Sequence, residues 1–129
     1  MNKIITLTSD YKPDLPDAQI RYYQKFLSNK EANHFFDAFI SKIPWQEDKV
    51  KVFGKIYAQP RLTSLHSNKS TTYTYAGLTL KPQRMTTELL SLLERINSVC
   101  NHEFNCVLLN LYRDGSDSNG WHADNEKEL

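Results

Sequence analysis

The residues with the clearest chemical potential lie near the end of the chain, in the sequence His122-Ala123-Asp124. We expect Trp121 to Asp124 to form a short strand, and in a strand residues i and i+2 point to the same face. An imidazole and a carboxylate placed in this way can bind one metal ion together. They are two of the three ligands in the facial triad of non-haem Fe(II). A surface His–Asp pair is the alternative, because H-x-D also occurs by chance.

Charge is distributed unevenly along the chain, although the formal net charge is only +1. Residues 49–84 contain no Asp or Glu, and their basic residues are Lys49, Lys51, Lys55, Arg61, Lys69, Lys81 and Arg84. Residues 113–128 carry five acidic side chains against two basic ones. The basic segment suits a polyanion and the acidic end suits a metal ion or a cation, with two solvated surfaces as the alternative.

Length and composition indicate one small globular domain or part of a larger one. The chain has 129 residues, of which 24% are charged and 40% hydrophobic, which excludes a disordered tail, a collagen-like chain and a coiled coil. We expect no membrane segment, since no apolar run approaches ~20 residues, and no signal peptide. Two cysteines, Cys100 and Cys106, are too few for a disulfide framework. We expect them to be reduced and partly buried, in a cytoplasmic or nuclear protein.

Two helices are expected to support a structure that is mainly β. Ser28 and Glu31 fit a capping box, and Pro44 ends the apolar periodicity that follows. Its apolar residues are Ala32, Phe35, Phe36, Phe39, Ile40 and Ile43, and we expect the aromatics among them to lie in the core. A second helix is expected from Thr86 or Thr87 to Asn97, with an apolar face formed by Leu89, Leu90, Leu93 and Ile96.

Alternating or β-branched segments predict strands over most of the remaining chain. These segments are 50–53 and 55–57, which we expect to form a hairpin, then 61–66, 70–75 and 104–112. Residues 114–118 have the composition of a turn. The order of elements favours a β-sheet or barrel core with supporting helices over a doubly wound α/β fold.

Several ordered motifs resemble the AlkB-like family of Fe(II)/2-oxoglutarate dioxygenases, most closely the branch that repairs alkylated bases. The family signature is an N-x-Y strand, an R-D-G-x-D turn and W-H-x-D-D-E. Residues 110–115 and 117–126 match it, with Asn125 in place of the usual Asp. Upstream segments that also resemble the family are 44–45, 53–55, 60–63 and 73–77. The resemblance covers roughly residues 26–129.

The resemblance implies a double-stranded β-helix, which is a jelly-roll variant. It implies an extended lead-in over residues 1–25, a dioxygenase domain over 26–129, and a nucleotide-recognition lid over 45–84. The family's third iron ligand is a downstream His, followed by arginines that clamp 2-oxoglutarate. The sequence has no His after His122. We therefore expect the C-terminal part of the domain to be missing and the chain to be inactive alone.

The implied activity is oxidative dealkylation of N-alkylated bases in DNA, with RNA as the alternative. Iron, dioxygen and 2-oxoglutarate hydroxylate the alkyl carbon, and the base is released with an aldehyde. His122 and Asp124 match the first two iron ligands, while Asn110 and Tyr112 match the residues that bind 2-oxoglutarate. Judged without the family, the favoured interpretation of Asn110 is a strand-end turn residue and that of Tyr112 a core aromatic.

The same resemblance assigns residues to nucleic-acid binding. Tyr75 matches an aromatic that stacks on the flipped base, and Tyr73, two residues earlier, shares its face. Phe53 matches a hydrophobic finger that fills the gap in a duplex. The alternatives are a cross-strand aromatic pair for the tyrosines and a strand core residue for Phe53.

The remaining assignments concern charged residues. Glu126 matches an acid that helps to read the target base, and Lys55 and Arg61 are candidate phosphate contacts. Solvated surface charge is the alternative for all three. Two other functions stay open: a non-catalytic nucleic-acid binder, and a dioxygenase that acts on a lipid or protein. We expect a monomer whose macromolecular partner is DNA or RNA.

Overall fold

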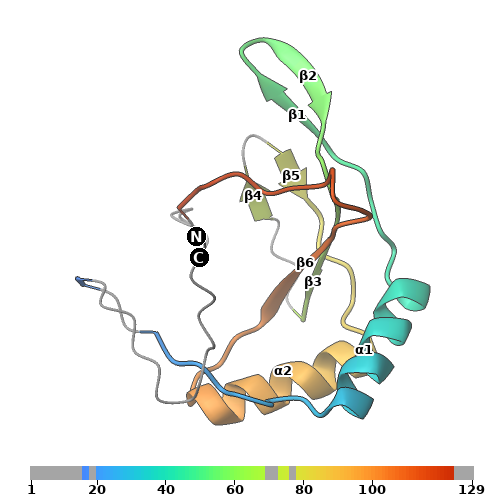
Figure 1. Ribbon diagram of the computed structural model, residues 1–129. Helices are drawn as coiled ribbons and strands as arrows, with labels where there is room; N and C mark the ends of the chain where they lie inside the picture. The colour runs from blue at the N-terminus through green and yellow to red at the C-terminus, as the bar shows by residue number, and fades with distance from the viewer. Residues whose placement is uncertain (1–15, 18–19, 69–72, 76–77, 124–129) are drawn as a thin grey trace, which may run out of the picture. The chain divides into compact units, whose positions relative to one another are not determined.

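Two helices and six strands form the regular structure of residues 16–17, 20–68, 73–75 and 78–123, which the computed structural model describes (Figure 1). In chain order they are α1 (Asn29–Lys42), β1 (Lys49–Val52), β2 (Lys55–Ala58), β3 (Leu62–Ser67), β4 (Tyr73–Tyr75), β5 (Leu78–Leu80), α2 (Thr87–Cys100) and β6 (Cys106–Leu111). The prediction of a mainly β chain with two helices is confirmed. The chain divides into two compact units, residues 1–39 and 40–129.

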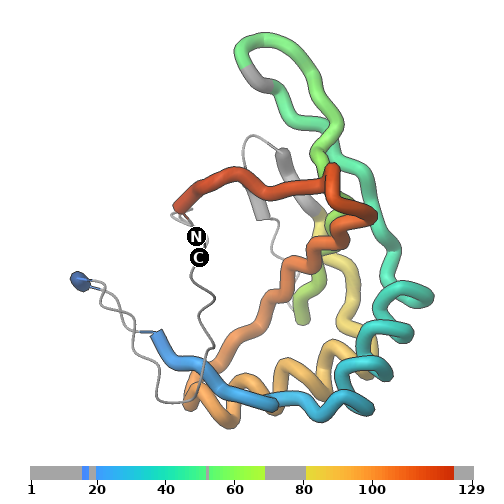
Figure 2. The backbone as a smooth tube through the Cα atoms, viewed as in Figure 1, coloured from blue at the N-terminus to red at the C-terminus, as the bar shows by residue number. Residues whose placement is uncertain are grey.

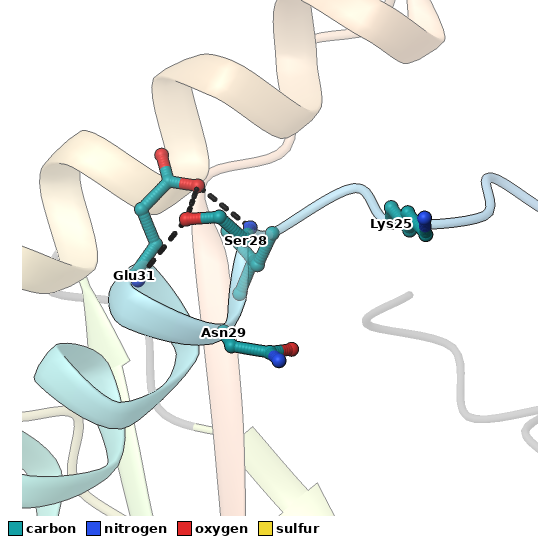
Figure 3. Close-up of a pocket in the computed structure, with 5 residues that line it drawn as sticks. Lys25, Ser28, Asn29 and Glu31 are labelled. Carbon is teal, nitrogen blue, oxygen red and sulfur yellow. Dashed lines mark hydrogen bonds between the residues drawn. The ribbon is translucent and has the colours of Figure 1, made fainter.

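Helix α1 begins with the predicted capping box (Figure 3). The Ser28 hydroxyl accepts a hydrogen bond from the backbone N–H of Glu31 at 3.3 Å. The Glu31 carboxylate accepts one from the backbone N–H of Ser28 at 2.7 Å. Two of the N–H groups that a helix start leaves without partners are thereby satisfied. The helix ends at Lys42, two residues before Pro44, as the sequence predicts.

The apolar face of α1 is buried only in part. Ala38 and Ile43 are buried, but Phe36 is 63% exposed and Ile40 is 43% exposed. The prediction of a core position for the aromatics is therefore wrong for Phe36, and Ala32 is exposed as well. The apolar residues of this segment cover a wider arc of the helix than the arc that is buried.

Helix α2 has well-defined ends. The Thr86 hydroxyl accepts a hydrogen bond from the N–H of Leu89 at 3.2 Å, which makes Thr86 the N-cap. At the other end Asn101 has a φ of 51° and its N–H bonds the carbonyl of Asn97, as in a left-handed C-cap. The helix runs three residues beyond the predicted end at Asn97. Leu89 and Leu93 are its buried residues.

Strands β3 and β6 form an antiparallel pair, with a register from Leu62 opposite Leu111 to Ser67 opposite Cys106. Strand β3 is almost entirely buried, including the core residue Leu65. Along β6, exposed positions alternate with half-buried ones. One face of β6 is therefore covered while the other, which carries Asn110, stays open.

Strands β1 and β2 form a hairpin closed by the two residues Phe53 and Gly54. Both residues have positive φ, 47° and 80° respectively, which is the backbone of a type I′ turn. Figure 1 shows this hairpin reaching out beyond the β3–β6 pair. Strands β4 and β5 form a third antiparallel pair. Strand β5 was not predicted, and residues 70–72 of the predicted strand lie outside the described residues.

The described strands form three separate two-stranded sheets, so the β-sheet or barrel core that the sequence predicts is not assembled within the described residues and stays a prediction. The prediction of a strand from Trp121 is wrong for residues 121–123, which are irregular. Figure 2 traces them as part of an irregular segment that follows β6. Within the part of the chain that the structure describes, no strand pairs with this segment.

The two cysteines of the chain lie on its surface. Cys100 and Cys106 are both free and exposed, so the prediction that they are partly buried is wrong. Cys100 lies in the last turn of α2, and Cys106 on the open face of β6.

Neither α1 nor α2, the two helices of the described residues, has the length and apolar character needed to cross a membrane.

Candidate metal and nucleic-acid sites

The candidate metal site is built at the end of β6 and in the irregular segment 112–123 after it. Asn110 is exposed in β6, and Tyr112 is 46% exposed just after the strand. Exposed and half-buried residues alternate along β6, and both positions fall on the exposed side, as the i, i+2 spacing predicts. The two side chains therefore project from the same exposed face.

A salt-bridged turn directs the chain from β6 toward His122. The Asp117 carboxylate accepts hydrogen bonds at 2.8 Å from both the backbone N–H and the Nε of Arg113. These hydrogen bonds lower the pKa of Asp117 to about 2 and raise that of Arg113. Arg113 also donates to Glu47 at 3.0 Å. Residues 114–118 were predicted only as a turn, and the structure adds a bidentate, charge-assisted contact between Arg113 and Asp117.

The imidazole of His122 has a defined orientation. Its Nδ1 lies 2.8 Å from the carbonyl of Gly120, and because a carbonyl only accepts, Nδ1 must be the donor. In the neutral ring Nε2 then carries the lone pair. Metal-bound histidines usually use this arrangement, so His122 fits a metal ligand. An open pocket of about 340 Å³ beside it is lined by Asn119, Gly120, Trp121 and His122.

The complete ligand pair cannot be placed, because Asp124 lies outside the described residues, as does Glu126. Among the residues that are described, no group of three His, Cys, Asp or Glu side chains gathers to hold a metal ion. Of the two predicted iron ligands, the structure positions His122 alone.

Arg61 lies in a different environment from the one predicted. It was expected to contact phosphate, but it is only 7% exposed. Its Nε donates to the Oδ1 of Asn110 at 3.0 Å and its Nη1 to the carbonyl of Ser118 at 3.4 Å. The structure thus brings together two predicted residues that were assigned different roles. The hydrogen bond from Arg61 to Ser118 was not predicted, because the acceptor is a backbone carbonyl, which every residue type has.

The β1–β2 hairpin exposes apolar and basic side chains together. Phe53, at its tip, is fully exposed, at 102%, so the alternative of a strand core residue is excluded. Lys49, Lys51 and Lys55 on the two strands are exposed as well. Exposed positive charge beside an aromatic side chain is a combination found on surfaces that bind single-stranded nucleic acid.

The positions of Tyr73 and Tyr75 follow from the pairing of strands β4 and β5. Tyr73 pairs with Leu80 and Tyr75 with Leu78 in the β4–β5 ladder. Two residues apart on one strand, the tyrosines share a face of this pair. Lys81 and Arg84, which follow β5, are exposed and extend the basic segment.

Comparison with known proteins gives consistent matches. Residues 19–129 match the 2OG-Fe(II) oxygenase superfamily. The chain is 41% identical over 81 residues to the DNA oxidative demethylase ALKBH2 of Bos taurus, covering 63% of this chain and 29% of that protein. It is 33% identical to the Homo sapiens ALKBH2, covering 83% of this chain and 42% of that protein. It is 33% identical to the alpha-ketoglutarate-dependent dioxygenase alkB homolog 3 of Mus musculus, covering 87% and 39% respectively.

The chain thus spans between 29% and 42% of the length of these relatives. The family match, in contrast, extends over most of the chain, from residue 19 to residue 129. It includes the hairpin, the β3–β6 pair and the segment that carries His122. The chain therefore belongs to the 2OG-Fe(II) oxygenase superfamily, in its AlkB-like branch.

Proposed function

We propose that this chain serves the oxidative dealkylation of N-alkylated bases in DNA, with RNA as the alternative. Family membership supports Fe(II) and 2-oxoglutarate as the cofactors. The names of the relatives support a nucleic-acid substrate, since ALKBH2 is a DNA oxidative demethylase. The exposed basic hairpin of this chain agrees with such a substrate.

Four residues would serve the cofactors. His122 and Asp124 would hold the iron, and Asn110 and Tyr112 would hydrogen-bond 2-oxoglutarate. The Nδ1 hydrogen bond of His122 to a carbonyl suits this role. When bound, iron with 2-oxoglutarate and dioxygen supplies the oxidant that hydroxylates the N-alkyl carbon, after which the base is released with an aldehyde.

The observation that carries the proposal is the position of Phe53. A fully exposed aromatic side chain at the tip of a hairpin gains nothing from packing. Its positive φ of 47° adds a conformational cost. Both costs are explained if Phe53 enters an unstacked base step while the neighbouring lysines contact phosphates. Tyr75 and Tyr73 would then stack on the flipped base, and Glu126 would help to read it.

We also propose a division of the chain into a lead-in, a lid and part of a jelly roll. Residues 26–129 would form part of a jelly roll, with 45–84 as its nucleotide-recognition lid and 1–25 as a lead-in. The free thiols of Cys100 and Cys106 agree with a nuclear or cytoplasmic protein, and we propose a monomer. That the 129 residues alone lack activity stays a prediction.

Oligonucleotide binding tests the nucleic-acid part of the proposal. The protein, expressed from its complete coding sequence, should bind a methylated oligonucleotide with an affinity that falls as salt rises. Phe53→Ala and Tyr75→Ala should each weaken binding about tenfold, since a stacked base contributes ~1–3 kcal/mol. Fluorescence anisotropy over a series of salt concentrations gives both quantities.

Phe36→Ala is the matched control, because Phe36 is an exposed aromatic on α1, outside the hairpin. It should leave binding unchanged. Binding that neither hairpin nor β4 substitution affects would contradict the proposal. Equal competition by methylated and unmodified oligonucleotides would favour a binder that does not recognise alkylation. Undetectable binding to either would favour a dioxygenase of another substrate.

A further inference from the structure

Arg61 is an enclosed cation that links three parts of the candidate site. It precedes β3, and its guanidinium reaches Asn110 in β6 and the carbonyl of Ser118 in the segment leading to His122. The residue before it takes part as well, because the carbonyl of Pro60 accepts a hydrogen bond from the N–H of Ser118 at 2.8 Å. Ser118 is thus held through both of its backbone groups by two successive residues.

The contact with Arg61 determines how the Asn110 amide is turned. A guanidinium nitrogen can only donate, so the atom 3.0 Å from Arg61 Nε must be the amide oxygen. The oxygen and the NH₂ group lie on opposite sides of an amide. With its oxygen on Arg61, Asn110 directs its NH₂ group away from the guanidinium.

This orientation matters for the ligand that Asn110 is proposed to bind. At neutral pH the oxygens of 2-oxoglutarate accept hydrogen bonds and none donates. Only the NH₂ end of Asn110 can therefore bind 2-oxoglutarate, and an amide turned the other way would present its oxygen to an anion. An Asn amide can flip by 180°, which exchanges its oxygen and its NH₂ group. The useful orientation therefore needs a partner that can only donate, as a guanidinium does.

We propose that Arg61 is a positioning residue for 2-oxoglutarate binding: it holds the Asn110 amide with its NH₂ group toward the cosubstrate. Through Ser118, it also ties Asn110 to the segment that carries His122. The inference rests on the proposed role of Asn110. It replaces the role predicted for Arg61 from the sequence, in which Arg61 contacts phosphate.

Lysine cannot replace Arg61 in this role, although it keeps the charge. The guanidinium uses two nitrogens of a rigid planar fork, Nε for Asn110 and Nη1 for Ser118. A lysine ammonium is a single point on a flexible stem. Arg61→Lys should therefore behave more like Arg61→Met than like the unchanged protein in 2-oxoglutarate binding.

Isothermal titration calorimetry of 2-oxoglutarate tests the proposal without using nucleic acid. The protein, expressed from its complete coding sequence, is loaded with Fe(II) under anaerobic conditions. Arg61→Met should weaken 2-oxoglutarate binding by about tenfold, as expected for loss of a hydrogen bond to a charged group. Asn110→Ala should weaken it as well, and the double variant should be no worse than Asn110→Ala alone.

Two controls separate positioning from charge and from folding. Lys30→Met removes one exposed positive charge from α1 and should leave 2-oxoglutarate binding unchanged. The melting temperature of each variant shows whether it folds, and if Arg61→Met does not, Arg61→Lys decides. The oligonucleotide affinity of the Arg61 variants and its salt dependence should stay as in the unchanged protein.

The outcomes distinguish this inference from the proposed function. If Asn110→Ala weakens 2-oxoglutarate binding but neither folded Arg61 variant does, the inference is wrong and the role of Asn110 survives. A reduced salt dependence of oligonucleotide binding with unchanged 2-oxoglutarate affinity would make Arg61 a phosphate contact, also against the inference. If the calorimetric pattern is found but no methylated oligonucleotide is turned over, the inference holds and only the proposed substrate fails.

Discussion

Single side chains determine the path of the chain between β6 and His122. Asp117 accepts hydrogen bonds from the backbone N–H and the side chain of Arg113. Asp114 accepts hydrogen bonds from the hydroxyl of Ser116 and, at 2.8 Å, from its N–H. These hydrogen bonds lower the pKa of both carboxyl groups. The loop that presents His122 is therefore held by contacts that depend on ionised carboxylates.

The titration of Asp117 provides a prediction at this scale. Its pKa is lowered to about 2, chiefly by the hydrogen bond from the Arg113 side chain, whereas an unperturbed Asp titrates near about 3.9. The stability that this carboxylate contributes is therefore fully present above the unfolded pKa and is lost as the pH falls through about 2. NMR titration of the Asp117 carboxyl carbon should give a midpoint near the lower value.

A substitution of Arg113 serves as the control for this titration. In Arg113→Met the main cause of the shift is removed, so the pKa of Asp117 should move back toward its ordinary value. A normal midpoint for Asp117 in the unchanged protein would show that the Arg113 contact does not persist in solution. His122 would then not follow a fixed loop.

Among the elements, the β1–β2 hairpin shows the clearest conflict between stability and the proposed function. A type I′ turn favours Asn-Gly, yet this turn is Phe53-Gly54, with a φ of 47° at Phe53. We predict that Phe53→Asn stabilises the hairpin by about 1 kcal/mol while weakening oligonucleotide binding. Amide hydrogen exchange of β1 and β2 measures the first effect.

Phe53→Ala separates the two effects, because alanine removes the ring but keeps the cost of the positive φ. It should weaken oligonucleotide binding as much as Phe53→Asn does, without slowing hydrogen exchange in the hairpin. Faster exchange in Phe53→Asn would mean that the aromatic ring supports the hairpin, and that its exposure reflects no role in binding.

At the scale of the whole molecule, most elements could be predicted from the sequence. The capping box at Ser28, the helix start near Thr86 and the end of a strand at Gly54 carry local signals that residue type and spacing reveal. The strands of the β3–β6 pair were predicted for the same reason. Strand β5 is only three residues long, too short for its alternation to be recognised.

The burial of Arg61 and the exposure of Phe36 could not be predicted, because both depend on tertiary contacts. The burial of Arg61 depends on partners 49 and 57 residues away, one of them a backbone carbonyl. The exposure of Phe36 depends on which arc of α1 is covered, since apolar periodicity alone marks a wider face. The proposed roles of Asn110, Tyr112 and His122 came from ordered motifs of the family. The structure adds the contact of Asn110 with Arg61 and that of His122 with the carbonyl of Gly120.

The central claim is that the protein removes alkyl groups from nucleic acid bases, and formaldehyde release tests it most directly. The protein, expressed from its complete coding sequence, is incubated with an oligonucleotide carrying N-methylated bases, Fe(II) and 2-oxoglutarate in air. We predict release that requires both cofactors, stops with His122→Ala and does not occur with the unmodified oligonucleotide. Absence of release from methylated DNA and methylated RNA alike, by folded protein that binds 2-oxoglutarate, would contradict the account.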